Sequence, residues 1–98
     1  MVMEAVEVAT EHPHIVVIDR AAGPCAVIRG TRTAVWFIMR QIRAGDSPEA
    51  IVEALPHLTA AGVYDAISYY HDHRTETDPI IDELDQLAAE DPVINIGA

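Results

Sequence analysis

Arginine is the residue type in this sequence whose placement most suggests a chemical role. All six lysine or arginine positions are arginines, and five of them fall in residues 20–45, a segment without a single acid. A guanidinium group offers planar, paired donors that match phosphate and carboxylate oxygens. The candidates for contacts to a nucleic-acid backbone are Arg29, Arg32, Arg40 and Arg43. The alternative, that these arginines pair with nearby acids such as Glu49 and Glu53, stays open.

Trp36 stands in the same segment and could form part of a contact surface. A helix predicted over residues 33–44 has one apolar face, and Trp36 falls about a quarter-turn away from it, in line with Arg40 and Arg43. A tryptophan exposed among arginines indicates contact with a partner. The alternative is that Trp36 completes the core or a dimer seam.

The histidines form no recognisable metal site in the sequence. His71 and His73 stand two residues apart in a predicted helix and so point in different directions, unlike the pair four residues apart that favours metal binding. His12 and His14 flank a proline and could converge in an extended segment, but no cysteine or carboxylate cluster completes a site there. We therefore expect no bound metal and no cofactor.

The sequence also lacks a recognisable catalytic pattern. No serine, histidine and acid, and no cysteine and histidine, follow one another in a compelling order. Cys25 follows a proline and is typical of a small buried apolar residue. Asp82, Glu83 and Asp85 belong to one acidic helix, where a solvated face explains them better than acid–base catalysis. We expect that the chain is not an enzyme.

Composition bounds the class of protein. The chain has 98 residues, of which 50% are hydrophobic, enough for one small domain with a core and too many for an acidic disordered chain. No apolar run approaches the ~20 residues of a membrane span, and no signal peptide is recognisable, so we expect no membrane association. The single cysteine cannot form an internal disulfide, which favours a cytoplasmic setting.

Charge is distributed unevenly along the chain. Residues 1–19 carry a net charge of −4, residues 20–45 carry +5, and residues 46–98 carry −11. The total of −10 opposes binding to nucleic acid except at the local arginine patch. Any such contact is expected to depend strongly on salt.

An N-terminal β-hairpin is predicted ahead of the helices. Residues 14–20 contain four consecutive β-branched apolar residues, which is typical of a buried strand, and residues 25–29 give a second strand after a Gly-Pro turn. Residues 1–13 are interpreted as a weak strand or an N-terminal arm.

Apolar spacing then predicts four helices. The first covers residues 33–44, with Thr31 or Thr33 as its N-cap and Gly45 just past its end. The second begins after Ser47, with a proline in its first turn.

The last two helices follow the same rules. The third begins after Thr59 and runs to about residue 73. The fourth begins at Asp78 and Pro79 and ends before residue 91, followed by a short apolar tail. These elements predict a mostly α fold in which a helix-turn-helix-like helical bundle follows a small N-terminal hairpin.

Three short motifs occur in a distinctive order. They are Ile-Arg-Gly-Thr-Arg at 28–32, Ala-Gly-Asp-Ser-Pro-Glu-Ala-Ile at 44–51 and Leu-Pro-His-Leu-Thr at 55–59. Over about residues 14–73 this order resembles the domain-of-unknown-function 433 family. The resemblance implies a helix-turn-helix-like core, which we place over residues 14–75. The segment 1–13 precedes this core, and the acidic helix and apolar tail over 76–98 form an extension that the family pattern does not define.

The resemblance also implies a function. Members of this family often look like antitoxins that are paired with PIN-type ribonuclease toxins. We therefore expect the antitoxin of a type II toxin–antitoxin pair, with regulation of its own operon as an additional role and a homodimer as its oligomeric state. The alternatives are a DNA-binding transcriptional regulator without a toxin, which would bind operator DNA, and a structural homo-oligomeric module.

The expected partner surface combines apolar anchors with acids. The candidate partner-binding residues are Trp36, Ile80, Ile81, Leu84, Leu87, Val93, Ile94 and Ile96. Carboxylates of the fourth helix would face basic residues of the toxin, and the apolar tail could bind by strand addition. The third helix exposes mostly small or acidic residues, so it is poorly suited to direct base readout.

Overall fold

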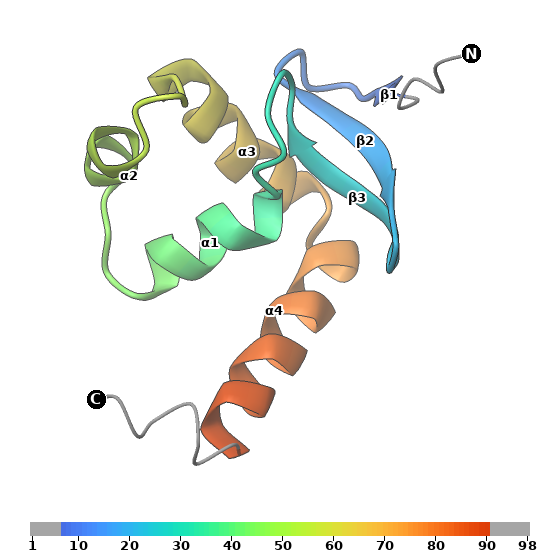
Figure 1. Ribbon diagram of the computed structural model, residues 1–98, viewed down its shortest axis with the longest axis vertical. Coiled ribbons are helices and arrows are strands. Elements are labelled where there is room, and N and C mark those ends of the chain that lie inside the picture. The colour runs from blue at the N-terminus through green and yellow to red at the C-terminus, as the bar shows by residue number, and fades with distance from the viewer. Residues whose placement is uncertain (1–6, 91–98) are drawn as a thin grey trace.

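The computed structural model describes residues 7–90, and in this part of the chain four helices pack beside a three-stranded antiparallel sheet (Figure 1). The strands are β1 (Glu7–Ala9), β2 (Ile15–Arg20) and β3 (Gly23–Ile28). The helices are α1 (Val35–Arg43), α2 (Pro48–Ala54), α3 (Ala60–Asp72) and α4 (Arg74–Glu90). The fold is therefore mixed α and β with helices dominating. None of these helices is both long and apolar enough to cross a membrane.

The predicted hairpin is formed by β2 and β3. Its register runs from Ile15 opposite Ile28 to Arg20 opposite Gly23. Gly23 has a φ of +118°, a conformation that favours glycine, at the point where the chain turns back. β1 pairs with the other edge of β2, so the segment interpreted as a strand or an arm contributes a strand over Glu7–Ala9.

The hairpin contributes to two hydrophobic clusters. Ile15 and Ile28 belong to the main core with the helices, whereas Val16 and Val27 belong to a smaller cluster with Ala34. Successive strand residues point to opposite faces, so one apolar run supplies both clusters. A bridge between Val27 and Ala34 joins β3 to the start of α1 and so positions that helix.

Side-chain caps place α2 and α3 where the sequence predicts them. The hydroxyl of Ser47 accepts a hydrogen bond from Ala50 N at 3.1 Å, and that of Thr59 accepts one from Gly62 N at 3.0 Å. Gly45, with a φ of +108°, lies between α1 and α2 as predicted.

The N-cap of α1 differs from the prediction. The helix begins after Ala34, which provides no side-chain cap. Thr31 instead closes the preceding turn, because its hydroxyl donates to the carbonyl of Ile28 at 2.8 Å and accepts from Thr33 N at 3.0 Å. The threonines therefore stabilise the turn, and the bridge to β3 fixes the start of the helix.

The start of α4 also differs from the prediction. The helix begins at Arg74 rather than at Asp78, and Pro79 lies inside it. Thr77 supports this early start, since its N–H and its hydroxyl both donate to the carbonyl of His73 at 3.2 Å. The expected boundary between residues 75 and 76 therefore falls inside α4.

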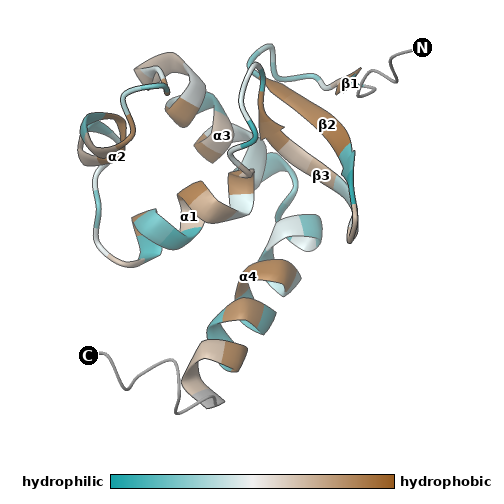
Figure 2. Cartoon of the chain, viewed as in Figure 1, coloured by the Kyte–Doolittle hydropathy of each residue, from teal (hydrophilic) through white to brown (hydrophobic). Residues whose placement is uncertain are grey.

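The side chain of Ile81 packs α4 against the main core. It is fully buried, as are those of Ile38 on α1 and Val63 on α3. Figure 2 shows hydrophobic and hydrophilic stretches alternating along α4, and a hydrophobic N-terminal half of α1 followed by a hydrophilic end. Ile81 was predicted to bind a partner, and this prediction is wrong, because the residue packs inside its own chain.

This packing predicts unequal effects of the same substitution at neighbouring positions. Ile81→Ala should lower the free energy of unfolding by about 2–5 kcal/mol, the usual cost of removing a buried isoleucine. Ile80→Ala is the matched control, because Ile80 is 42% exposed and its loss should change stability by about 0.5 kcal/mol or less. Urea unfolding followed by circular dichroism measures both. Equal losses of stability in the two variants would contradict the packing of α4 against the core through Ile81.

Candidate partner-binding site

Trp36 lies where the hairpin, α1 and α4 meet. The bridge that positions Ala34 places Trp36 in the first turn of α1, half-buried against both hydrophobic clusters. Its ring meets that of Phe37 edge-on, with 6.3 Å between centroids. Trp36 is therefore held by packing while part of its surface stays accessible.

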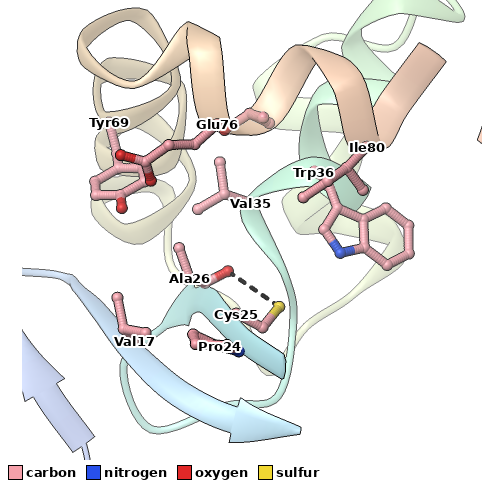
Figure 3. A pocket seen from close by; sticks show the side chains of 10 residues that line it. Val17, Pro24, Cys25, Ala26, Val35, Trp36, Tyr69, Glu76 and Ile80 are labelled. Atoms are coloured by element: carbon pink, nitrogen blue, oxygen red, sulfur yellow. Dashed lines mark hydrogen bonds between the residues drawn. The ribbon is translucent and has the colours of Figure 1, made fainter. Parts of the chain in front are cut away.

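An apolar groove opens on one side of Trp36, between the hairpin and α4. We call it the Trp36 groove and define it by Pro24, Cys25, Trp36, Ile80 and Leu84. Figure 3 shows Trp36 next to Ile80 above strand β3, which carries Pro24 and Cys25. Two consecutive elements, β3 and α1, and the distant helix α4 thus contribute to one concave surface.

The Trp36 groove brings together part of the predicted partner-binding set. Trp36, Ile80 and Leu84 line it, and Leu87 lies one turn beyond Leu84 on α4 with 55% of its surface exposed. Ile81 is excluded because it is buried in the core. Val93, Ile94 and Ile96 lie outside the described residues.

The four arginines of the predicted patch have different environments, because two of them pair with acids of α4. The side chain of Arg40 donates to Asp85 at 3.0 Å, and that of Arg43 donates to Asp78 at 2.9 Å and to Asp82 at 3.3 Å. The alternative that the arginines pair within the fold is therefore correct for these two. Their partners are the aspartates of α4, however, and not the glutamates of α2 that the sequence suggested.

Asp78 is the most constrained of these carboxylates. It accepts a hydrogen bond from the hydroxyl of Tyr70 at 2.6 Å and others from Arg43 and Arg74. The Tyr70 hydroxyl, and then the two arginines, lower the pKa of Asp78 despite an opposing effect of burial. This aspartate therefore stays charged and holds the end of α1 against α4.

Arg29 and Arg32 have a different environment. Neither makes an ion pair with any acid in the described part of the chain. Arg32 lines a second pocket beside Trp36, together with Phe37, His57 and Arg20, the last of which also lines the Trp36 groove. We call this the arginine pocket.

Arg20 was not among the predicted site residues. Its guanidinium donates to the carbonyl of Arg32, and its buried Nε has no hydrogen-bond partner. The signal that could have identified it was its position at the end of β2, opposite the turn glycine, where its side chain can reach back toward the loop before α1. Arg20 and Arg32 thus bring two cations to the mostly apolar arginine pocket.

A second region missed by the sequence surrounds His12. The side chain of His12 is held between Asp65, 3.0 Å from Nδ1, and Asp72, 2.8 Å from Nε2. His73 is similarly held between Glu76, 3.0 Å from Nδ1, and Glu11, 2.6 Å from Nε2. Carboxylates do therefore surround His12, contrary to the sequence interpretation, because folding delivers them from 53 and 60 residues away.

We call Glu11, His12, Asp65, Asp72 and His73 the histidine cluster. Burial alone would lower the pKa of His12, but its hydrogen bonds to Asp65 and Asp72 outweigh burial and raise that pKa. The pKa of His73 is raised mainly by its hydrogen bond to Glu76, with a further contribution from Glu11. Both imidazoles are thus stabilised in the charged form.

Residues 15–70 match the profile of a family described as protein of unknown function, DUF433, which is more than half of the chain. The chain belongs to the DUF433 family. The resemblance identified from the motifs is therefore confirmed. Comparisons with curated proteins and with solved structures gave no match.

In this DUF433 chain the recognisable motifs have structural roles. Gly30 has a φ of +82° in the turn between β3 and α1, and Ser47 and Thr59 cap the next two helices. α4 begins after the matched segment ends. The Trp36 groove therefore joins the DUF433 core to a helix that lies outside the match.

The histidine cluster predicts how stability depends on pH. In a buffer with chelator, the free energy of unfolding should fall as the pH rises above about 6.5, the ordinary histidine pKa. The pKa values of His12 and His73 are raised by folding, so their contribution is complete below the unfolded pKa and is lost as the pH rises through the folded values. Urea unfolding at several pH values measures this.

Two double variants test the assignment. His12→Gln/His73→Gln should flatten the pH dependence, whereas His57→Gln/His71→Gln, which alters two exposed histidines outside the cluster, should keep it. A stability that rises between about pH 6.5 and 8.5 in the unaltered chain would contradict the effect that linkage predicts.

Proposed function

We propose that this chain is the cytoplasmic antitoxin of a type II toxin–antitoxin pair and that it binds and inhibits a PIN-type ribonuclease toxin through the Trp36 groove. The supporting observation is that Trp36, Ile80 and Leu84, three residues expected to bind a partner, line one concave apolar surface. The resemblance of the motifs to antitoxin-like members of the family points the same way. Regulation of its own operon is an additional role.

The apolar anchors would supply most of the affinity. Aromatic and aliphatic side chains that enter a desolvated pocket dominate binding energy at protein interfaces. Ile80 and Leu87 are 42% and 55% exposed, and together with half-buried Leu84 they form a stripe on α4 that continues the groove. A toxin segment that covers this stripe would remove it from water.

Fewer carboxylates of α4 are available to a partner than the charge of the helix suggests. Asp78, Asp82 and Asp85 are paired with arginines of the same chain, so they are poorly placed to bind a partner. Glu83 lines the Trp36 groove and makes no ion pair within the described residues. Glu83 is therefore the carboxylate that we assign to a basic residue of the toxin.

Recovery of the tagged full-length chain from its native host tests this proposal. In mild salt the unaltered chain should bring down a small nuclease in fixed stoichiometry, whose activity is released when the chain is removed by denaturation. Ile80→Asp/Leu87→Asp should retain less than about a tenth of that nuclease, since two buried charges at an interface cost several kcal/mol. Mass spectrometry and a nuclease assay are the measurements.

The matched control is Val8→Asp. Val8 is 56% exposed on β1, at the opposite edge of the sheet from the groove, so this variant should recover as much nuclease as the unaltered chain. Equal recovery by Ile80→Asp/Leu87→Asp would refute the assigned surface. A homodimer in light scattering that this variant dissociates would instead assign the groove to a second copy.

DNA binding is the second candidate function, and the observation that favours it is that Arg29 and Arg32 make no ion pair with the acids of residues 7–90. We propose that α2, the turn and α3 form the helix-turn-helix-like unit. Arg29 and Arg32 lie in the loop before α1, next to this unit, because β3 ends at Ile28 and packs against α3, where a Cβ at Gly62 would lie 3.0 Å from the side chain of Ile28. These two guanidinium groups, which have no ion-pair partner among the described residues, could bind phosphates of operator DNA.

A salt titration separates these arginines from the other two. Arg29→Ala/Arg32→Ala should weaken binding to DNA from the upstream operator region and reduce the salt slope by about 2, since each phosphate contact contributes roughly 0.9. Arg40→Ala/Arg43→Ala is the control and should leave the slope unchanged, because these arginines are paired with α4. Fluorescence anisotropy measures both. The opposite pattern would dismiss the loop as the DNA contact.

A further inference from the structure

We propose that Glu11, His12 and Asp72 bind a divalent transition-metal ion such as Zn²⁺. Each residue presents one donor atom, and these atoms lie within 4.8 Å of one another. Within the group, Nε2 of His12 lies 2.8 Å from Asp72 Oδ2 and 3.9 Å from Glu11 Oε2. A small adjustment of the two exposed carboxylates would bring all three donors to metal–ligand distance of about 2.0–2.2 Å.

The orientation of His12 is what distinguishes this group from a cluster of surface acids. His12 is only 8% exposed, its ring meets Tyr69 edge-on, and its Nδ1 is bonded to Asp65. Asp65 is itself fixed, since its other carboxylate oxygen accepts from the backbone N–H of His14 at 2.8 Å. A histidine that ligates metal through one nitrogen commonly donates the other to such a carboxylate.

His73 provides a second support. Its ring stacks on Tyr69 with 4.0 Å between centroids, its Nδ1 is bonded to Glu76, and its Nε2 is 2.6 Å from Glu11. His73 therefore holds the carboxylate of Glu11 near His12 and acts as a positioning residue. His12 and His73 thus share one arrangement: Nδ1 is bonded to a supporting carboxylate, and Nε2 is bonded to a carboxylate of the proposed site.

The donor set selects the class of metal. One imidazole nitrogen and two carboxylate oxygens suit Zn²⁺ and neighbouring divalent ions, whereas Cu⁺ prefers thiolates and Ca²⁺ or Mg²⁺ prefer oxygen donors alone. Three protein ligands leave a position for water. The ion would link the loop between β1 and β2 to the junction of α3 and α4, which are 60 residues apart in the chain.

Calorimetric titration of the chelator-treated full chain with ZnCl₂ tests this site. The unaltered chain should bind one ion per chain. His12→Gln and Asp72→Asn should each weaken binding at least about a hundredfold, and Asp65→Asn should weaken it about 10- to 100-fold, as expected for an outer carboxylate. Glu11→Gln and Asp72→Asn alter exposed side chains, so they keep the test valid if His12→Gln does not fold.

His71→Gln is the matched control, because His71 is exposed and lies in α3 directly before Asp72. It should leave the affinity unchanged. The absence of saturable Zn²⁺ binding in the unaltered chain would overturn the proposal. So would Glu11→Gln and Asp72→Asn variants that bind as the unaltered chain does, or a His71→Gln variant that loses affinity equally. In Co²⁺-loaded protein, visible absorption bands that disappear in Asp72→Asn would support the site independently.

Discussion

The burial of Ile81 is the contact on which the rest of this arrangement depends. Successive residues of a helix are rotated by about 100°, so fixing one side chain in the core fixes the direction of all the others. With Ile81 pointing inward, Ile80 and Leu84 fall on the flank that faces the hairpin and form the wall of the Trp36 groove. The opposite flank carries the aspartates that meet α1. One buried isoleucine therefore separates an apolar surface from a charged one.

The ion pairs between α1 and α4 set the register of the two helices more than they stabilise them. Exposed pairs of this kind contribute about 0–1 kcal/mol each, less than the burial of Ile81. Arg40 and Arg43 also lie at the C-terminal end of α1, where the helix dipole favours cations. The consequence is an asymmetric helix: its C-terminal arginines are used within the fold, while Arg20 and Arg32 near its N-terminal end remain without an acidic partner in the described chain.

Features that depend on neighbours in the sequence could be predicted, and features that depend on the folded chain could not. The hairpin and the caps at Ser47 and Thr59 follow from local turn and capping chemistry. The early start of α4 was missed because Pro79 is a strong local signal, whereas the bonds that override it arise from Thr77. The carboxylates around His12 were missed because nothing in a sequence places residue 72 beside residue 12.

Folding and the proposed partner binding would be linked in this chain, because α4 contributes both to the core and to the Trp36 groove. α4 lines the Trp36 groove only when this helix is packed against the core. A partner that occupies the groove would therefore bind the packed state and stabilise it. At a concentration one hundred times its dissociation constant, such a partner adds about 2.7 kcal/mol to the free energy of unfolding. The DUF433 match ends before α4, so this linkage belongs to the helix that follows the family segment. In the proposed complex, a groove built across that boundary would allow the DUF433 core to keep its fold while the following helix supplies part of the partner-binding surface.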